Sequence, residues 1–265
     1  MELAPVDGPG WMSSMSTPLP NSTCQQLLQL ASHPRDQVMT KMTDDLRHLS
    51  ARCAGRWGVA VAITIDALNL CMQLRGDRAF LDIYDHPDEL AAFLQAGVDV
   101  NIKLVEQQRA AIDMTCEGGV YDFFNAGWGP NQTIPMSVDC YNLCSPDVYA
   151  QFGLHYQQQL IDHFGGANLH VHGNGRQLLD QLAKLRGTVV ALIADDGADI
   201  AALDDLEAVK RRLGAITPVV SCTRDPFVRR LREKSLVGGV FYRVEGLKNI
   251  EQANRLMDSV RSYTV

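Results

Sequence analysis

Two histidines separated by one residue stand just before a glycine-rich turn, in the stretch NLHVHGNG at 168–175. Successive side chains of a β-strand point to opposite faces, so a strand here would turn His170 and His172 to one face. Leu169 and Val171 would then form the apolar face. Imidazole is a common metal ligand and a common acid–base group. The pattern predicts either a metal site or a layer of hydrogen-bonded histidines in the core.

Other residues that could bind a metal follow further strand-like segments. Glu245 closes FYRVEG, and two histidines with one carboxylate form a known set for Zn²⁺ or Fe²⁺. Cys222, after ITPVVS, is a weaker candidate, and Asp195 and Asp196 follow VVALIA. Each has a structural alternative: Glu245 as a partner of Arg243, Cys222 as a small buried residue, and the two aspartates as a helix-capping loop.

Two loop residues are candidates for contact with a substrate. Asp139, in SVDCYNLCSP, precedes a strongly capped helix and either positions a substrate or hydrogen-bonds its own loop. Asn174 lies just beyond the histidine strand and either donates a hydrogen bond to a bound group or shapes the turn. We predict catalytic roles for both.

The elements that must position these residues alternate along the chain. Apolar segments typical of buried strands lie at 57–65, 119–125, 168–173, 188–194, 216–221 and 238–244. Segments with helical periodicity separate them, at 67–84, 86–114, 145–164, 175–185, 205–213 and 225–234, and another closes the pattern at 249–263. This alternation predicts an α/β fold with a parallel sheet covered by helices.

A TIM-type (β/α)8 barrel fits the alternation but requires eight strands. With six, the sequence predicts a barrel that is shortened or incomplete at its N-terminal side, forming one domain over 21–265. Residues 1–20, rich in Pro, Gly, Ser and Met, are expected to be an irregular leader. A doubly wound open sheet is the alternative, although no G-x-G-x-x-G follows a first strand.

Composition limits the partners. The net charge of -7 argues against nucleic acid and against an anionic membrane surface. No apolar run reaches the roughly 18–20 residues of a membrane span. The 7 cysteines show no CxxC and no framework spacing, which favours reduced thiols and predicts a cytoplasmic protein.

The run SVDCYNLCSPDVYAQFGLHYQQQLIDHFGGANLHVHGNG resembles the uroporphyrinogen decarboxylase superfamily. Members of that superfamily combine an Asp-containing loop, an LSPE-x-Y-x-x-F-x-x-P-Y helix and a strand ending in H-x-C-G-N. LRGDRAFLDIYDHPDELAAFL is similar to their LRG-x-x-x-(F/L)-L-x-D-(L/I)-Y-x-x-P-E segment. The similarity extends over roughly residues 55–263 and implies a TIM-type barrel.

The resemblance implies one of two activities: metal-free decarboxylation of uroporphyrinogen, or zinc-dependent methyl transfer between a corrinoid protein and a thiol. The methyltransferases hold zinc with an H-x-C pair and a later cysteine. Here those positions correspond to His170, His172 and, near RVEG, Glu245. We therefore expect a methyltransferase-like enzyme that binds Zn²⁺ and uses a corrinoid carried by a partner protein.

Two alternatives stay open. A divergent decarboxylase would need arginines for the substrate's carboxylates, and Arg224 and Arg243 are the candidates near strand ends. A non-catalytic subunit is the other alternative, because an incomplete barrel exposes two sheet edges that a second copy or a partner could cover.

Overall fold

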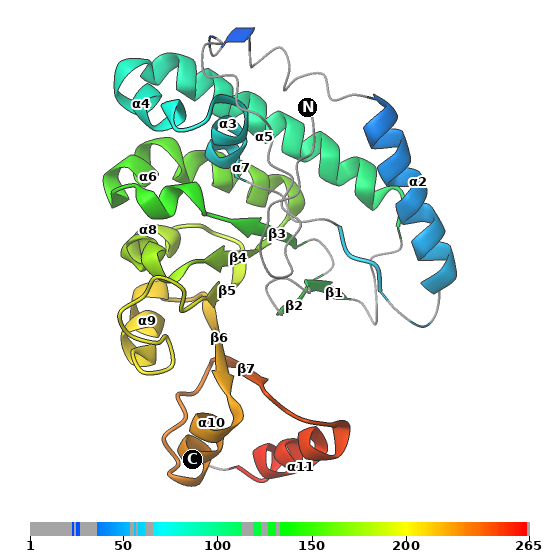
Figure 1. Cartoon of the computed structure of the whole chain (residues 1–265), viewed down its shortest axis with the longest axis vertical. Helices are drawn as coiled ribbons and strands as arrows, with labels where there is room; N and C mark the ends of the chain where they lie inside the picture. The colour runs from blue at the N-terminus through cyan, green and yellow to red at the C-terminus, as the bar shows by residue number, and fades with distance from the viewer. Residues whose placement is uncertain are drawn as a thin grey trace.

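The protein is an α/β protein built on a five-stranded parallel sheet (Figure 1). The computed structural model describes residues 23, 25–26, 36–53, 56, 58–61, 66–112, 119–122, 127–130 and 133–263. The sheet has the order β3-β4-β5-β6-β7. Its strands are β3 (Ile134–Ser137), β4 (Ala167–Val171), β5 (Thr188–Ile193), β6 (Thr217–Thr223) and β7 (Phe241–Glu245).

Helices connect consecutive strands, as parallel pairing requires. Those before the sheet are α2 (Asp36–Cys53), α3 (Ala67–Arg75), α4 (Arg78–Asp85) and α5 (Pro87–Arg109). Those within or after it are α6 (Pro146–Phe152), α7 (Leu154–Phe164), α8 (Leu179–Leu182), α9 (Leu206–Leu213), α10 (Arg224–Arg232) and α11 (Ile250–Arg261), with the short 3₁₀ helices η1 (Cys140–Leu143) and η2 (Gly173–Leu178). Among the described helices, none has both the length and the apolar character needed to cross a membrane.

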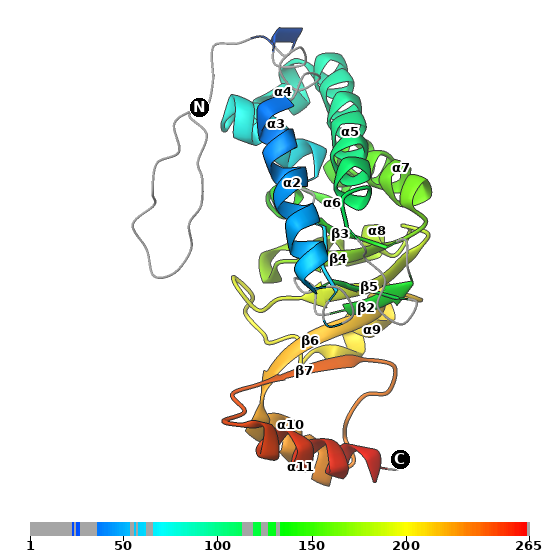
Figure 2. The same cartoon turned by 90° about the vertical axis from the view of Figure 1, so that its right-hand side faces the viewer.

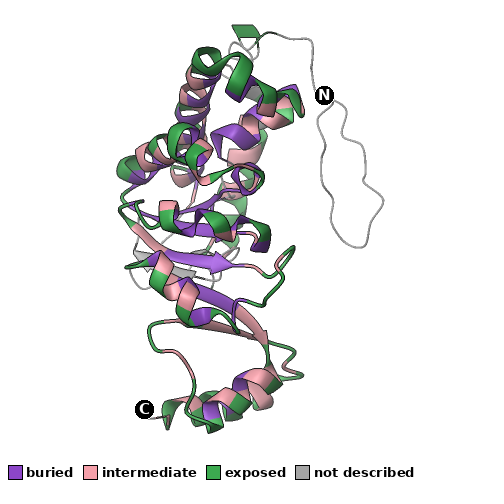
Figure 3. Ribbon diagram, turned by 90° about the vertical axis from the view of Figure 1, so that its left-hand side faces the viewer, coloured by how far each residue is buried: buried purple, intermediate pink, exposed green. Residues whose placement is uncertain are grey.

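The two faces of the sheet belong to different apolar clusters. Leu169 and Val171 of β4 lie in the large core that includes residues of α3, α5, α7 and α9. Val190, Leu192 and Val219 form a separate small cluster. This arrangement confirms that the alternate apolar residues of the histidine strand face the helices. Buried residues concentrate in the sheet and the adjoining helices, while α10 and α11 at the far end are largely exposed or partly buried (Figure 3).

The strands predicted at 168–173, 188–194, 216–221 and 238–244 are confirmed as β4 to β7, with shifted ends. The prediction at 119–125 is corrected. Its described part, β1 (Gly119–Asp122), pairs antiparallel with β2 (Gly127–Pro130) in a separate two-stranded sheet. Strand β3, which begins four positions after the end of β2, was not predicted. It has only four residues and one of them is a proline, so its sequence gives little indication of a strand.

Two more predictions concern the N-terminal part of the chain, a strand at 57–65 and a leader at 1–20. In the predicted strand at 57–65, the described residues 58–61 have no regular secondary structure. The predicted leader at 1–20 lies outside the described residues. The α/β class and a parallel sheet are therefore established, and the part of the chain that the structure describes contributes five parallel strands to it, where six were expected.

The helices before the sheet form one end of the molecule (Figure 2). The predicted helical stretch at 67–84 is two helices, because Gly76 adopts a positive φ of 70° that ends α3. Helix α5 begins at Pro87, whose fixed φ suits the first turn of a helix. It packs against both α3 and α7. The first turn of α3 is thereby held beside the sheet.

Candidate metal centre

The carboxyl ends of β3 and β4 bring together three of the predicted site residues. Potential ligand atoms of Asp139, His170 and His172 all lie within 4.8 Å of one another. The register explains the meeting: Ser137 is paired with His170 across the two parallel strands, so the chain beyond Ser137 runs beside the chain beyond His170. Asp139 was predicted as a substrate-positioning acid, which stays a prediction, and the structure places it beside the two histidines.

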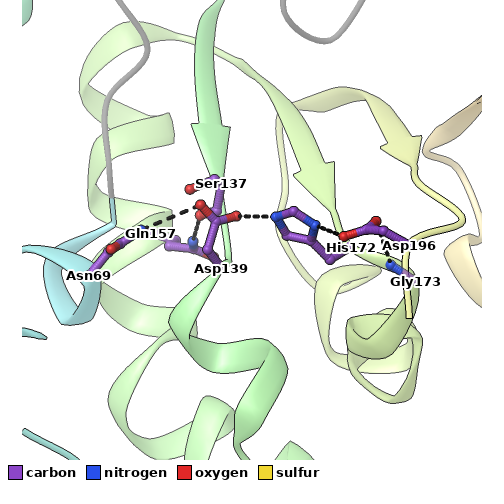
Figure 4. A network of polar contacts seen from close by, with 7 residues as sticks. All are labelled: Asn69, Ser137, Asp139, Gln157, His172, Gly173 and Asp196. Atoms are coloured by element: carbon purple, nitrogen blue, oxygen red, sulfur yellow. Dashed lines mark hydrogen bonds and ion pairs between the residues drawn. The ribbon is translucent and has the colours of Figure 1, made fainter. Parts of the chain in front are cut away.

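A hydrogen-bonded chain fixes the end of β3 below Asp139. The Gln157 side-chain amide of α7 donates to the Ser137 carbonyl at 2.9 Å (Figure 4). The Tyr149 hydroxyl in turn donates to the Gln157 side-chain oxygen. Tyr149 and Gln157 are both buried. Immediately after Asp139 the chain turns into η1, which directs it away from the sheet and leaves the carboxylate facing His172.

His172 lies between two carboxylates (Figure 4). Its Nδ1 is hydrogen-bonded to Asp196, and its Nε2 is 3.3 Å from Asp139 Oδ1. If Nδ1 carries the proton shared with Asp196, a neutral ring has an acceptor at Nε2, 3.3 Å from a carboxylate oxygen of Asp139. Two acceptors at that distance repel each other. A second proton on the ring, or one cation bound by both atoms, would offset this repulsion.

His170 is the most buried of the three, with 9% of its surface exposed. Its ring lies edge to face with that of His172, and the ring centroids are 4.6 Å apart. Burial lowers the pKa of His170, and the nearby charge of His172 lowers it further. The lowered pKa favours the neutral imidazole, which is the form that binds a metal.

Asp196 supports His172 from the loop after β5. Burial acts to raise the pKa of Asp196, but the hydrogen bonds from His172 and from the Gly173 N–H outweigh it, so the pKa lies below its ordinary value. The Gly173 N–H donates to Asp196 Oδ1 at 3.4 Å. A side chain at Gly173 would clash, because a Cβ there would lie 2.5 Å from the Asp196 carbonyl oxygen. The glycine therefore permits the close approach of the two loops.

The residues fit a small divalent cation. Zn²⁺ ligands lie about 2.0–2.1 Å from the ion, so two ligands on adjacent corners of a tetrahedron are about 3.3 Å apart. The separation of Asp139 Oδ1 and His172 Nε2 matches that value. The group as a whole is wider, so binding would need small side-chain shifts. A carboxylate on the far nitrogen of a ligating histidine is typical of protein zinc sites.

The remaining predicted residues lie apart from this group. Glu245, at the exposed end of β7, accepts two hydrogen bonds from Arg243, at 3.0 and 2.6 Å. Cys222, on the neighbouring β6, lies close enough to Glu245 for that charge to contribute to its raised pKa, although burial is the larger cause. The metal-ligand group contains neither of them. The residue that joins the two histidines in the possible metal-binding group is Asp139, and Glu245, the predicted third ligand, lies outside that group.

Asp195 and Asn174, two further predicted residues, contact residues of the neighbouring loops and not the group of Asp139, His170 and His172. Asp195 Oδ1 accepts from Arg176 at 2.7 Å and from the Ala202 N–H at 2.6 Å, so this aspartate shapes its loop. Asn174 is exposed in η2. An added Cβ on Gly197 would lie 3.2 Å from the Asn174 Cβ, which places this side of Asn174 against the β5 loop.

Sequence reasoning missed Asn69. Its Nδ2 donates to Asp139 Oδ2 at 3.4 Å, on the other side of the carboxylate from His172 (Figure 4). Asn69 lies 70 residues before Asp139, and no spacing rule links the two positions. Asp66, whose buried side chain caps α3, was also missed. The pattern of an aspartate three residues before an asparagine at the start of a helix marks a capped helix but not a site.

Comparison with known proteins adds no assignment. Neither a scan of the chain against protein-family models nor a search among curated proteins gave a match.

Proposed function

We propose that this protein is a metal-dependent enzyme in which Asp139, His170 and His172 bind Zn²⁺. The observation that carries the proposal is the placement of His172 between two carboxylates, with Nε2 3.3 Å from Asp139 Oδ1 and Nδ1 hydrogen-bonded to Asp196. His170 contributes a second imidazole whose pKa is lowered by burial. Three protein ligands leave a tetrahedral ion one position for another group, as in catalytic zinc sites.

A bound zinc ion would lower the pKa of a thiol or water that fills this position. The chain's own residues would prepare the site for it. Asp196 would hold the His172 ring so that Nε2 faces the ion, and the buried surroundings of His170 would keep that ring neutral. Asp139 would supply negative charge, which balances part of the charge of a divalent ion.

For the reaction, we propose methyl transfer to a thiol, with the methyl group coming from a corrinoid on a partner protein. The support is the resemblance to the uroporphyrinogen decarboxylase superfamily in the segment that contains Asp139, His170 and His172. The ligand set differs from the thiolate-rich set of the superfamily's methyltransferases, since it has two imidazoles and a carboxylate. We further propose that the five-stranded sheet is part of a TIM-type barrel, which would put the ligands at its catalytic, C-terminal face.

Decarboxylation of uroporphyrinogen receives less support. It would need cationic groups for the carboxylates of the substrate. Arg224 pairs with Asp225 at 2.8 Å, and Arg243 pairs with Glu245 at 2.6 Å, so both candidate arginines already have carboxylate partners.

The test is the metal content of protein purified without added metal. The wild type is compared with His170→Ala, His172→Ala and the control His163→Ala, which removes an exposed histidine paired with Glu106. We expect close to one zinc per chain in the wild type and the control, and none in the two site variants. Absence of metal from the wild type, even after incubation with Zn²⁺, would rule out the metal site.

A second assay tests the reaction class. The zinc-loaded protein is incubated with methylcobalamin and a set of simple thiols, and loss of methylcobalamin is followed by absorbance and formation of the methyl thioether by mass spectrometry. We expect turnover that is lost in His172→Ala and kept in His163→Ala. Zinc binding without turnover of any thiol would argue against methyl transfer while leaving the metal site intact.

A further inference from the structure

Asn69 contacts the candidate metal ligand Asp139 from a distant part of the chain. It lies in the first turn of α3 and is 7% exposed. Its Nδ2 donates to Asp139 Oδ2, while Oδ1 of the same carboxylate faces His172. The two oxygens of Asp139 therefore have different neighbours, an amide on one side and an imidazole on the other (Figure 4).

The position of Asn69 is fixed by its own surroundings. Asp66 Oδ1 accepts a hydrogen bond from the Asn69 N–H at 2.8 Å, which caps the first turn of α3. Next to it, Ala67 packs closely against α5. A Cβ added to Gly97 would lie 3.0 Å from the Ala67 Cβ, so the two helices could not approach as closely with a larger residue there. Helix α3 also contacts η1, the turn that follows Asp139.

A carboxylate can bind a cation through one oxygen or through both. An amide that donates a hydrogen bond to one carboxylate oxygen occupies a lone pair of that oxygen and restricts rotation of the carboxylate. The other oxygen is then left to face the ion. Groups that hold ligands in this way are important for metal affinity, and their loss typically lowers it by about 10–100-fold. Among the described side chains, Asn69 is the one that donates a hydrogen bond to Asp139 Oδ2.

We propose that Asn69 is a positioning residue that makes Asp139 a one-oxygen ligand through Oδ1. This inference rests on the proposed metal site and adds a residue from outside the motif segment. It means that the helices before the sheet take part in forming the site, because α3 supplies the group that orients one of the ligands.

The experiment compares Zn²⁺ binding by the wild type, Asn69→Leu and Asn249→Ala, using competition with a chromophoric chelator. Asn69→Leu keeps the number and branching of the side-chain heavy atoms but cannot donate a hydrogen bond. Asn249→Ala is the control. It removes the side chain that caps α11, where Asn249 Oδ1 accepts a hydrogen bond from the Gln252 N–H at 2.9 Å. We expect affinity to fall by about 10–100-fold in Asn69→Leu and to change by less than about twofold in the control.

The visible spectrum of bound Co²⁺ gives a readout that a general loss of stability would not change. We expect altered band positions in Asn69→Leu, because the second oxygen of Asp139 becomes able to approach the ion. Asn69→Ser, which is too short to reach Asp139 but remains polar, is used in the same way if the leucine variant does not fold.

The outcomes separate the two proposals. If the wild type binds Zn²⁺ and both Asn69 variants bind it with unchanged affinity and an unchanged Co²⁺ spectrum, the role of Asn69 is refuted and the metal site stands. If the wild type does not bind Zn²⁺, the metal site itself is refuted, and the role of Asn69 with it.

Discussion

The two edges of the parallel sheet have similar residues at the ends of their strands but very different surroundings. At the β3–β4 edge, Asp139, His170 and His172 meet beneath α3, and Asp196 supports them from the next loop. At the β7 edge, Arg243 and Glu245 form a pair whose side chains are 40% and 51% exposed. His170, His172 and Glu245 were predicted as site residues from the same rule, that polar residues at the ends of strands face the active end, whereas Asp139 was predicted from its loop before a capped helix.

The difference shows that a polar residue at a strand end becomes part of a site only when neighbouring elements surround it. Exposure of the carboxylates does not separate the two edges, because the side chain of Asp139 is 39% exposed and that of Glu245 is 51% exposed. What differs is their neighbours: Asp139 lies beside His170 and Asn69, which are 9% and 7% exposed. Glu245 is paired with Arg243 two residues away, and such an exposed pair is screened by water.

The sharpest test of this comparison exchanges one carboxylate for alanine at each edge. We expect Asp139→Ala to lower Zn²⁺ affinity by roughly 100-fold or more, because it removes one of the three proposed ligands and leaves only the two imidazoles. Glu245→Ala should change it by less than about twofold. Calorimetric titration with Zn²⁺ measures both. A large loss in Glu245→Ala would restore that residue as a ligand.

The next largest effect concerns the buried carboxyl of Asp66. Burial raises its pKa to about 7, and the charge of Asp139 acts in the same direction. The folded protein then binds a proton more tightly than the unfolded chain, so the contribution of Asp66 to stability falls as pH rises from about 4 to about 7. Asp66→Asn cannot ionise and still caps α3.

We expect Asp66→Asn to be more stable than the wild type at pH 8 by a few kcal/mol, at ~1.4 kcal/mol per pKa unit, and to lose most of this advantage at pH 5. Urea unfolding of the metal-free proteins at both pH values measures this difference. An equal difference at the two pH values would mean that Asp66 does not titrate in this range.

A smaller effect is expected from packing near the site. A Cβ on Gly175 would overlap the Asn142 side-chain oxygen, whereas nothing lies within 4 Å of a Cβ on Gly238, shortly before β7. We expect Gly175→Ala to destabilise the protein by about 1–3 kcal/mol and Gly238→Ala to have little effect. Thermal unfolding compares the two. Similar melting temperatures would show that the η1–η2 contact can relax.

The smallest effect is expected at the β7 edge. The Arg243–Glu245 pair is exposed, and such pairs contribute about 0–1 kcal/mol. A double-mutant cycle with Arg243→Ala and Glu245→Ala, measured by urea unfolding at low and high salt, should give a coupling energy in that range that falls with salt. A coupling above 2 kcal/mol would contradict the view of this edge as solvated.

The sequence predicted the sheet best where strands are long and apolar, as in β5 and β6. It also predicted which face of the sheet the His170 side chain points to, because successive side chains of a strand can point only to one face or the other. It did not predict β3, a short strand with Pro135, or the antiparallel pairing of β1, since strand direction depends on distant partners. For the site, spacing within one strand identified both histidines. Glu245 was predicted as the third ligand and Asp139 as a substrate-positioning acid, because a position at a strand end indicates which end of a sheet a residue occupies but not which strands adjoin it.

The contacts at the site join residues that are far apart in the chain: Asn69 and Asp139 are separated by 70 residues, and His172 and Asp196 by 24. These separations determine the order in which the contacts can form during synthesis. A ribosome releases the α3 segment first, then β3, then the histidine strand and finally the loop with Asp196. Contacts between distant parts of a chain form slowly. Until that last loop emerges, the imidazole of His172 lacks its carboxylate support, so the proposed metal site would be complete only late in synthesis and metal binding there would follow it.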